Sequence, residues 1–138
     1  MIDTHAHLDA CADPPGALLA RARAAGVARV VTIGSGIDSC RAALAICDTE
    51  AGVVCALGIH PHQAGEARPE DLEELRRLLA SSSAVAVGET GLDYYRDYAP
   101  RDRQRTLFEA QAALAAELGK ALVVHSRAAE ADTLAVLE

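Results

Sequence analysis

Residues 53–62 read VVCALGIHPH, which is an apolar run followed by two histidines on either side of a proline. The run shows no alternation of apolar and polar side chains, so it predicts a strand over Val53–Leu57 that is buried on both faces. Histidine side chains come directly after the end of that strand. A buried strand with imidazole groups at its C-terminal end is the feature from which the rest of the chain can be understood.

Similar apolar strands are predicted at four other places, namely Ile2–His5, Val27–Ile33, Ala84–Val87 and Ala121–Val124. Between them lie segments with helical periodicity, over residues 18–25, 38–48, 102–118 and 128–138, and from Pro69 onward. Gly26, Gly52 and Gly119 are placed where such helices should end. Apolar strands that alternate with helices predict an α/β protein with a parallel sheet.

Two parallel architectures are compatible with this alternation. A doubly wound open sheet places its site in one or two crevices, whereas a (β/α)8 barrel uses the C-terminal ends of most of its strands. Here four of the five predicted strands end in histidine or glutamate, and no G-x-G-x-x-G motif follows the first strand. The pattern favours a partial (β/α)8 TIM barrel with about five strand–helix units of the eight.

The overall charge argues against a broad electrostatic contact with nucleic acid, because the net charge is −7 and the pI is near 5.2. Four arginines cluster near the Glu89 motif and are compatible either with a local basic patch or with a solvated helix start: Arg96, Arg101, Arg103 and Arg105. The four cysteines form no C-x-x-C pair, no signal peptide precedes the first strand, and no apolar run approaches the ~20 residues of a membrane span. We expect a cytoplasmic protein without a membrane partner.

The candidate metal ligands are His5, His7, Glu89 and His125. His5 and His7 are two residues apart on a strand, so both side chains point to one face and can hold one ion. Glu89 follows a strongly apolar strand, and an unpaired buried charge is costly, so its carboxylate needs a partner. That partner is either an arginine or a pair of cations, one at each carboxylate oxygen. His125 is then a ligand of the second ion, or a hydrogen-bonded core histidine. This ligand set indicates a metal-dependent hydrolase with two divalent ions, which could be Zn, Mn or Mg. Glu89 is the expected catalytic residue, because its carboxylate would set the distance between the ions.

The substrate-binding candidates are His62 and Arg127. His60 and His62 flank Pro61, and we do not expect both histidines to bind metal, because other residues already supply the ligand positions. We expect His62 to contact the substrate, with a structural hydrogen bond as the alternative. Arg127 lies two residues beyond His125, and its planar guanidinium suits a phosphate, although it also fits a surface position at a helix start.

The chain resembles the TatD family of metal-dependent deoxyribonucleases, which have a barrel of the amidohydrolase type. The resemblance covers the whole chain and depends on four motifs: DTHAHLD (residues 3–9), GIHPH (58–62), GETGLDYY (88–95) and VHSR (124–127). It implies a divalent-metal phosphodiesterase with DNA as substrate, acting as an exonuclease on single strands. It also implies that His5 and His7 hold one ion, that Glu89 bridges, that His125 holds the other ion, and that His62 lies near the substrate phosphate.

The family pattern continues with a further metal-binding histidine and a late aspartate beyond Glu138. We therefore expect residues 1–138 to be a single domain that is the N-terminal portion of a hydrolase barrel, truncated at its C-terminus. Two other readings remain open: a metal-dependent hydrolase of another ester or amide, and an inactive metal-binding half-barrel. The strands at both ends of an incomplete barrel would also be exposed, which predicts self-association through the sheet edges.

Overall fold

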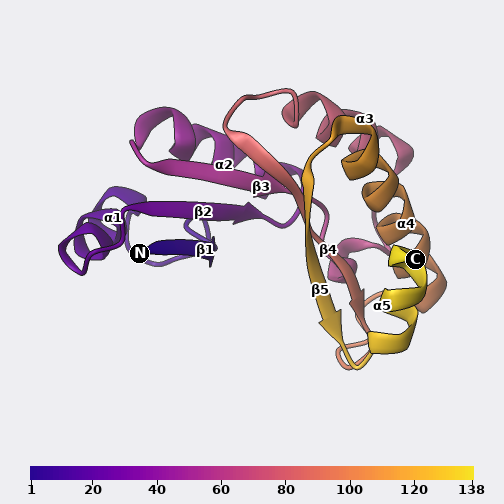
Figure 1. Cartoon of the computed structure of the whole chain (residues 1–138). Helices are drawn as coiled ribbons and strands as arrows, with labels where there is room; N and C mark the ends of the chain where they lie inside the picture. Colours follow the sequence, from indigo (N-terminus) through magenta and orange to yellow (C-terminus); the bar gives the residue numbers. More distant parts are fainter.

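A helix follows every strand in the computed structural model, which describes residues 1–138 (Figure 1). The elements, in chain order, are β1 (Ile2–Ala6), α1 (Pro15–Ala24), β2 (Arg29–Gly34), α2 (Ile37–Thr49), β3 (Val53–Leu57), the 3-10 turn η1 (Pro61–Gln63), α3 (Pro69–Leu78), β4 (Ala84–Asp93), α4 (Arg101–Leu118), β5 (Ala121–Arg127) and α5 (Glu130–Leu137). No helix combines the length and the apolar character that a membrane span requires.

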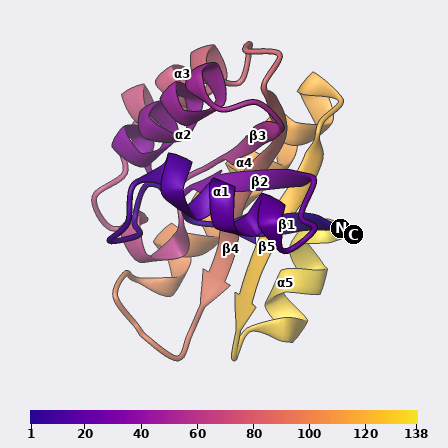
Figure 2. The same ribbon diagram turned by 90° about the vertical axis from the view of Figure 1, so that its left-hand side faces the viewer.

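The strands form a single parallel sheet in the order β1-β2-β3-β4-β5. A doubly wound sheet would reverse its strand order at a switch point, whereas a barrel adds each strand beside the previous one. The sequential order therefore confirms the barrel topology. The sheet curls from β1 to β5, and α2, α3 and α4 lie along its convex side (Figures 1 and 2). The chain is a curled half-barrel of five strand–helix units.

The main core lies between the sheet and helices α2, α3 and α4, and it is built from fully buried side chains such as Leu57, Leu75 and Val87. The middle strand β3 is almost completely covered, as its apolar sequence predicts. The expectation of burial on both faces is wrong for β1 and for much of β5, where most side chains are exposed. Both are edge strands with a neighbour on one side only, so apolar composition alone does not bury them.

Gln111 of α4 connects the helix layer to the strand ends that carry the site. It is fully buried, its Oε1 accepts the Ile59 N–H at 2.8 Å, and its Nε2 donates to the Ile59 carbonyl at 3.0 Å and to Thr90 Oγ1 at 2.7 Å. Ile59 lies one residue before His60, and Thr90 follows Glu89. These hydrogen bonds fix the backbone on both sides of the candidate ligands.

We expect Gln111→Leu to lower the free energy of unfolding by about 1–3 kcal/mol, because it leaves the buried N–H and C=O of Ile59 without partners. Denaturant unfolding followed by circular dichroism measures this change. Gln63→Leu is the matched control, since Gln63 is exposed. Equal stability of the two variants would contradict a structural role for the Gln111 hydrogen bonds.

Candidate metal centre

The candidate ligands meet at the C-terminal end of the sheet, because parallel strands all end on the same side. His5 lies on β1 and His7 follows it, Glu89 lies on β4, and His125 lies on β5. His60 immediately precedes η1, after the end of β3. Segments that are far apart in the sequence therefore bring imidazole groups around one carboxylate.

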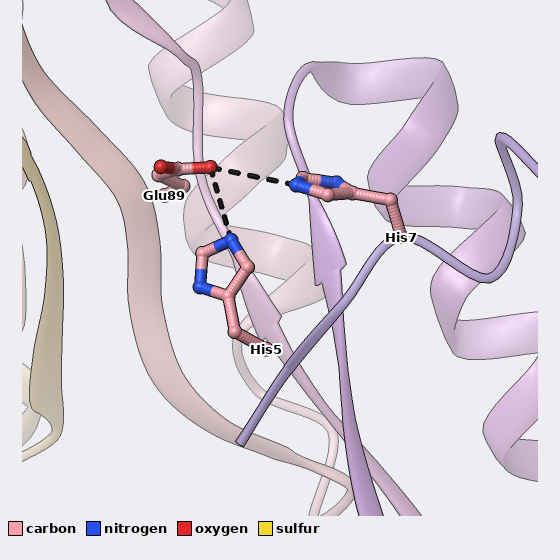
Figure 3. Close-up of side chains that lie close together, drawn as sticks. All are labelled: His5, His7 and Glu89. Carbon is pink, nitrogen blue, oxygen red and sulfur yellow. Dashed lines mark ion pairs between the residues drawn. The ribbon is translucent and has the colours of Figure 1, made fainter. Parts of the chain in front are cut away.

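Glu89 is the centre of this arrangement and is only 8% exposed. Its Oε2 lies 3.4 Å from Nε2 of His5 and 3.6 Å from Nε2 of His7 (Figure 3). Its other oxygen, Oε1, lies 3.1 Å from Nδ1 of His125. The two oxygens of one buried carboxylate thus face two different groups of imidazoles.

Two donor groups share Glu89, and within each group the ligand atoms lie within 4.8 Å of one another: His5, His7 and Glu89 form the first group, and His60, Glu89 and His125 form the second. Two ligands at about 2.1 Å from a tetrahedral ion are separated by about 3.4 Å. The oxygen–nitrogen distances around Glu89 are close to this value. Imidazole and carboxylate donors also suit Zn, Mn or Fe, so the residues present fit a divalent cation in each group.

His60 belongs to the second donor group, which the sequence analysis did not foresee. Its Nδ1 accepts the His62 N–H at 3.2 Å, and its Nε2 lies 3.3 Å from Nδ1 of His125. Burial, together with the nearby His125 and His62 rings, lowers the pKa of His60 to about 4. The imidazole is therefore neutral near pH 7. Because its Nδ1 accepts the His62 N–H, the single proton of the neutral ring lies on Nε2, the nitrogen that faces His125.

Asp93 is a second buried carboxylate at the site, and it too was missed. It is completely buried, and its Oδ2 lies 2.8 Å from Nε2 of His62 and 3.1 Å from Nε2 of His125. Its Oδ1 accepts the backbone N–H groups of Tyr95 and Arg96. Burial alone would raise the pKa of Asp93, but the hydrogen bonds from the Arg96 amide, His62 and His125 outweigh it and lower the pKa below the usual range.

The ionised Asp93 defines which nitrogen of His125 is free. A carboxylate only accepts hydrogen bonds, so the Nε2 atom facing it must carry the proton. In a neutral ring, Nδ1 then has a free lone pair, and this is the nitrogen that faces Glu89 and His60. A carboxylate that fixes the tautomer of a ligating histidine is a recurrent feature of metal sites.

The two substrate-binding candidates lie on the rim of the site. His62 is bonded to Asp93, and its ring packs edge-on against Tyr98 with the centroids 4.7 Å apart. The exposed Arg127 places its guanidinium carbon 4.3 Å from the centre of the Tyr95 ring. Contact of either residue with a substrate stays a prediction. A cavity of about 680 Å³ lies by α2 and α3, and no candidate metal ligand lines it.

Comparisons with known proteins agree with this geometry. The family model described as "TatD related DNase" matches residues 2–138. The chain is 39% identical to a Mycobacterium tuberculosis protein called "Uncharacterized metal-dependent hydrolase TatD", over 99% of this chain and 55% of that protein. It is 36% identical to the "3'-5' ssDNA/RNA exonuclease TatD" of Cronobacter sakazakii, over 88% of this chain and 46% of that protein.

Among solved structures, the crystal structure of YJJV, a TatD homologue from Escherichia coli K12, superposes with a TM-score of 0.90 at 30% identity. The match covers 99% of this chain and 54% of that protein, so the chain spans about half the length of the relatives that it matches. A TatD family hydrolase from Entamoeba histolytica, at 21% identity and a TM-score of 0.86, shows the same fold. The chain belongs to the TatD family of metal-dependent hydrolases.

Proposed function

We propose that this protein hydrolyses phosphodiester bonds of single-stranded DNA as an exonuclease, with two divalent metal ions. The observation that carries the proposal is the buried carboxylate of Glu89, whose two oxygens face separate groups of imidazoles. Such a carboxylate suits a pair of cations that share it as a ligand. The choice of substrate is supported by relatives from Cronobacter sakazakii and Edwardsiella piscicida that are named 3'-5' ssDNA/RNA exonucleases.

Each side chain then has a distinct role. His5 and His7 would hold one ion and His125 would hold the other, with Glu89 offering one oxygen to each. His60 lies beside His125, with Nε2 toward the Nδ1 atom of that ring. Divalent ions, when bound, lower the pKa of water and neutralise the charge that develops on the phosphoryl oxygens. Asp93 keeps the metal-binding nitrogen of His125 unprotonated. His62, held by Asp93 through Nε2, is placed to contact the substrate phosphate.

The test is the metal dependence of DNA degradation by the purified chain. We expect release of nucleotides from end-labelled single-stranded DNA in the presence of Mn²⁺ or Zn²⁺, a fall to background with a chelator, and recovery when the metal is restored. Single-stranded RNA and a small carboxyl ester are assayed in parallel. Hydrolysis that persists in the chelator, or turnover of the ester alone, would contradict the proposal.

A further inference from the structure

All three tyrosines of the chain lie within residues 94–98, in the segment that leaves β4 next to the metal centre. The chain has few aromatic residues, only 3% of its length, so this local concentration is unusual. Tyr95 is 66% exposed and Tyr98 is 64% exposed. Two large rings therefore stand in solvent beside the site, where neither contributes to the core.

Tyr98 is joined to the metal centre by a short series of contacts. Its ring packs edge-on against the ring of His62, and His62 is hydrogen-bonded to the buried Asp93. Asp93 in turn contacts His125, a member of the second donor group. A planar group stacked on Tyr98 would therefore lie beside the position at which a phosphate could reach the ions.

Two arginine side chains lie next to the Tyr95 ring. The guanidinium carbon of Arg127 lies 4.3 Å from the Tyr95 ring centre, and that of Arg96 lies 5.9 Å from it. Neither arginine forms an ion pair with a carboxylate, whereas several others, such as Arg41 and Arg76, do. The segment 94–98 also contains one acidic residue, Asp97. Although the chain carries a net charge of −7, the exposed Tyr95 ring thus has two arginines beside it that form no ion pair.

We propose that Tyr95 and Tyr98, together with Arg96 and Arg127, form a stacking subsite for the bases of single-stranded nucleic acid, a reading that rests on the proposed function. Each base offers a flat face that stacks on an exposed ring, whatever its sequence, and guanidinium groups add attraction to the phosphates. Only unpaired bases can be splayed onto such rings. The subsite would hold the nucleotides adjacent to the phosphate that is cleaved.

The test compares two fluorescent oligonucleotides of equal length and charge, an oligothymidylate and its abasic counterpart. Binding to the full chain is followed by fluorescence anisotropy, with a chelator present to prevent hydrolysis. We expect the parent protein to prefer the oligothymidylate. Tyr98→Ala and Tyr95→Ala should each weaken its binding by about tenfold while affecting the abasic strand little, because base–aromatic stacking contributes on that scale. Tyr98→Phe should retain the affinity.

Tyr94→Phe is the matched control, since it removes a tyrosine hydroxyl from the same loop. The Tyr94 ring is only partly exposed, lies under Arg101, and its hydroxyl donates to Asp132. We expect unchanged binding of both oligonucleotides. Far-UV circular dichroism checks that each variant is folded. We expect the Tyr95 and Tyr98 variants to fold, because both side chains are exposed.

Three outcomes would overturn the subsite: no binding of the oligothymidylate by the parent, equal binding of the abasic strand, or alanine variants within about twofold of the parent. A separate hydrolysis assay keeps the two proposals apart. Base-selective binding without DNA hydrolysis would refute the nuclease function and leave the subsite standing. Hydrolysis without base selectivity would refute the subsite alone.

Discussion

Glu89→Gln is expected to weaken the binding of both divalent ions by more than about 100-fold. The loss is larger than for an outer-shell contact because the substitution removes a ligand that both ions would share. The substitution keeps the shape of the side chain but removes its charge, and it replaces one ligating oxygen with an NH2 group. That NH2 group faces one of the two imidazole groups whichever way the amide is oriented. Hydrolysis of single-stranded DNA should fall to background in the same variant.

Isothermal titration with Mn²⁺ or Zn²⁺ measures the number of sites and the affinity of each. Glu73→Gln is the matched control, because Glu73 is an exposed glutamate of α3 and takes no part in either donor group. The control should bind both ions like the parent. If Glu89→Gln still binds two ions with parental affinity, the carboxylate does not bridge them, and the proposed centre would have to be abandoned.

The sequence predicts most elements well because their signals are local. The strand Val53–Leu57 agrees residue for residue with β3, and the helix expected over residues 102–118 starts one residue earlier in the structure. The fourth strand was predicted to end at Val87, yet β4 continues to Asp93. Gly88 and Gly91, with φ of +132° and +139°, read as breaks in a sequence. In the sheet they are required, since a Cβ at either would collide with the backbone of β5.

That early end of the fourth strand explains why Asp93 was missed. Glu89 and Asp93 are four residues apart on one extended strand, so they lie on the same face and point to the same pocket. Recognition of GETGLD as continuous strand would have placed both carboxylates in the site. The signal was present in the spacing, but the two glycines obscured it.

The roles of His60 and His62 could not be read from the sequence in the same way. Both belong to one short motif, and the path of η1 decides which ring turns toward His125 and which turns toward Asp93. That choice depends on contacts with β4 and β5, which are distant in the chain. The structure places His60 in the second donor group, and the expectation that the two histidines do not both bind metal stays a prediction.

Asp93→Asn should affect the two donor groups unequally, which distinguishes a positioning residue from a general structural one. The amide keeps the size of the side chain but loses the charge that holds the Nε2–H groups of His62 and His125. His125 is then free to take the other tautomer, with its proton on the nitrogen that faces Glu89. We expect metal affinity of the group containing His60 and His125 to fall by about 10–100-fold, as for other outer-shell partners of ligating histidines.

The group formed by His5, His7 and Glu89 has no contact with Asp93 and should retain its affinity. Two-site titration calorimetry measures this difference, and the ¹⁵N chemical shifts of the His125 ring report the tautomer directly. Asp132→Asn, at a carboxylate that accepts the Tyr94 hydroxyl, is the control for the loss of one negative charge nearby. An equal loss of affinity at both groups would mean that Asp93 supports the fold of the whole site, because a change of tautomer at His125 can weaken only the ion that His125 binds.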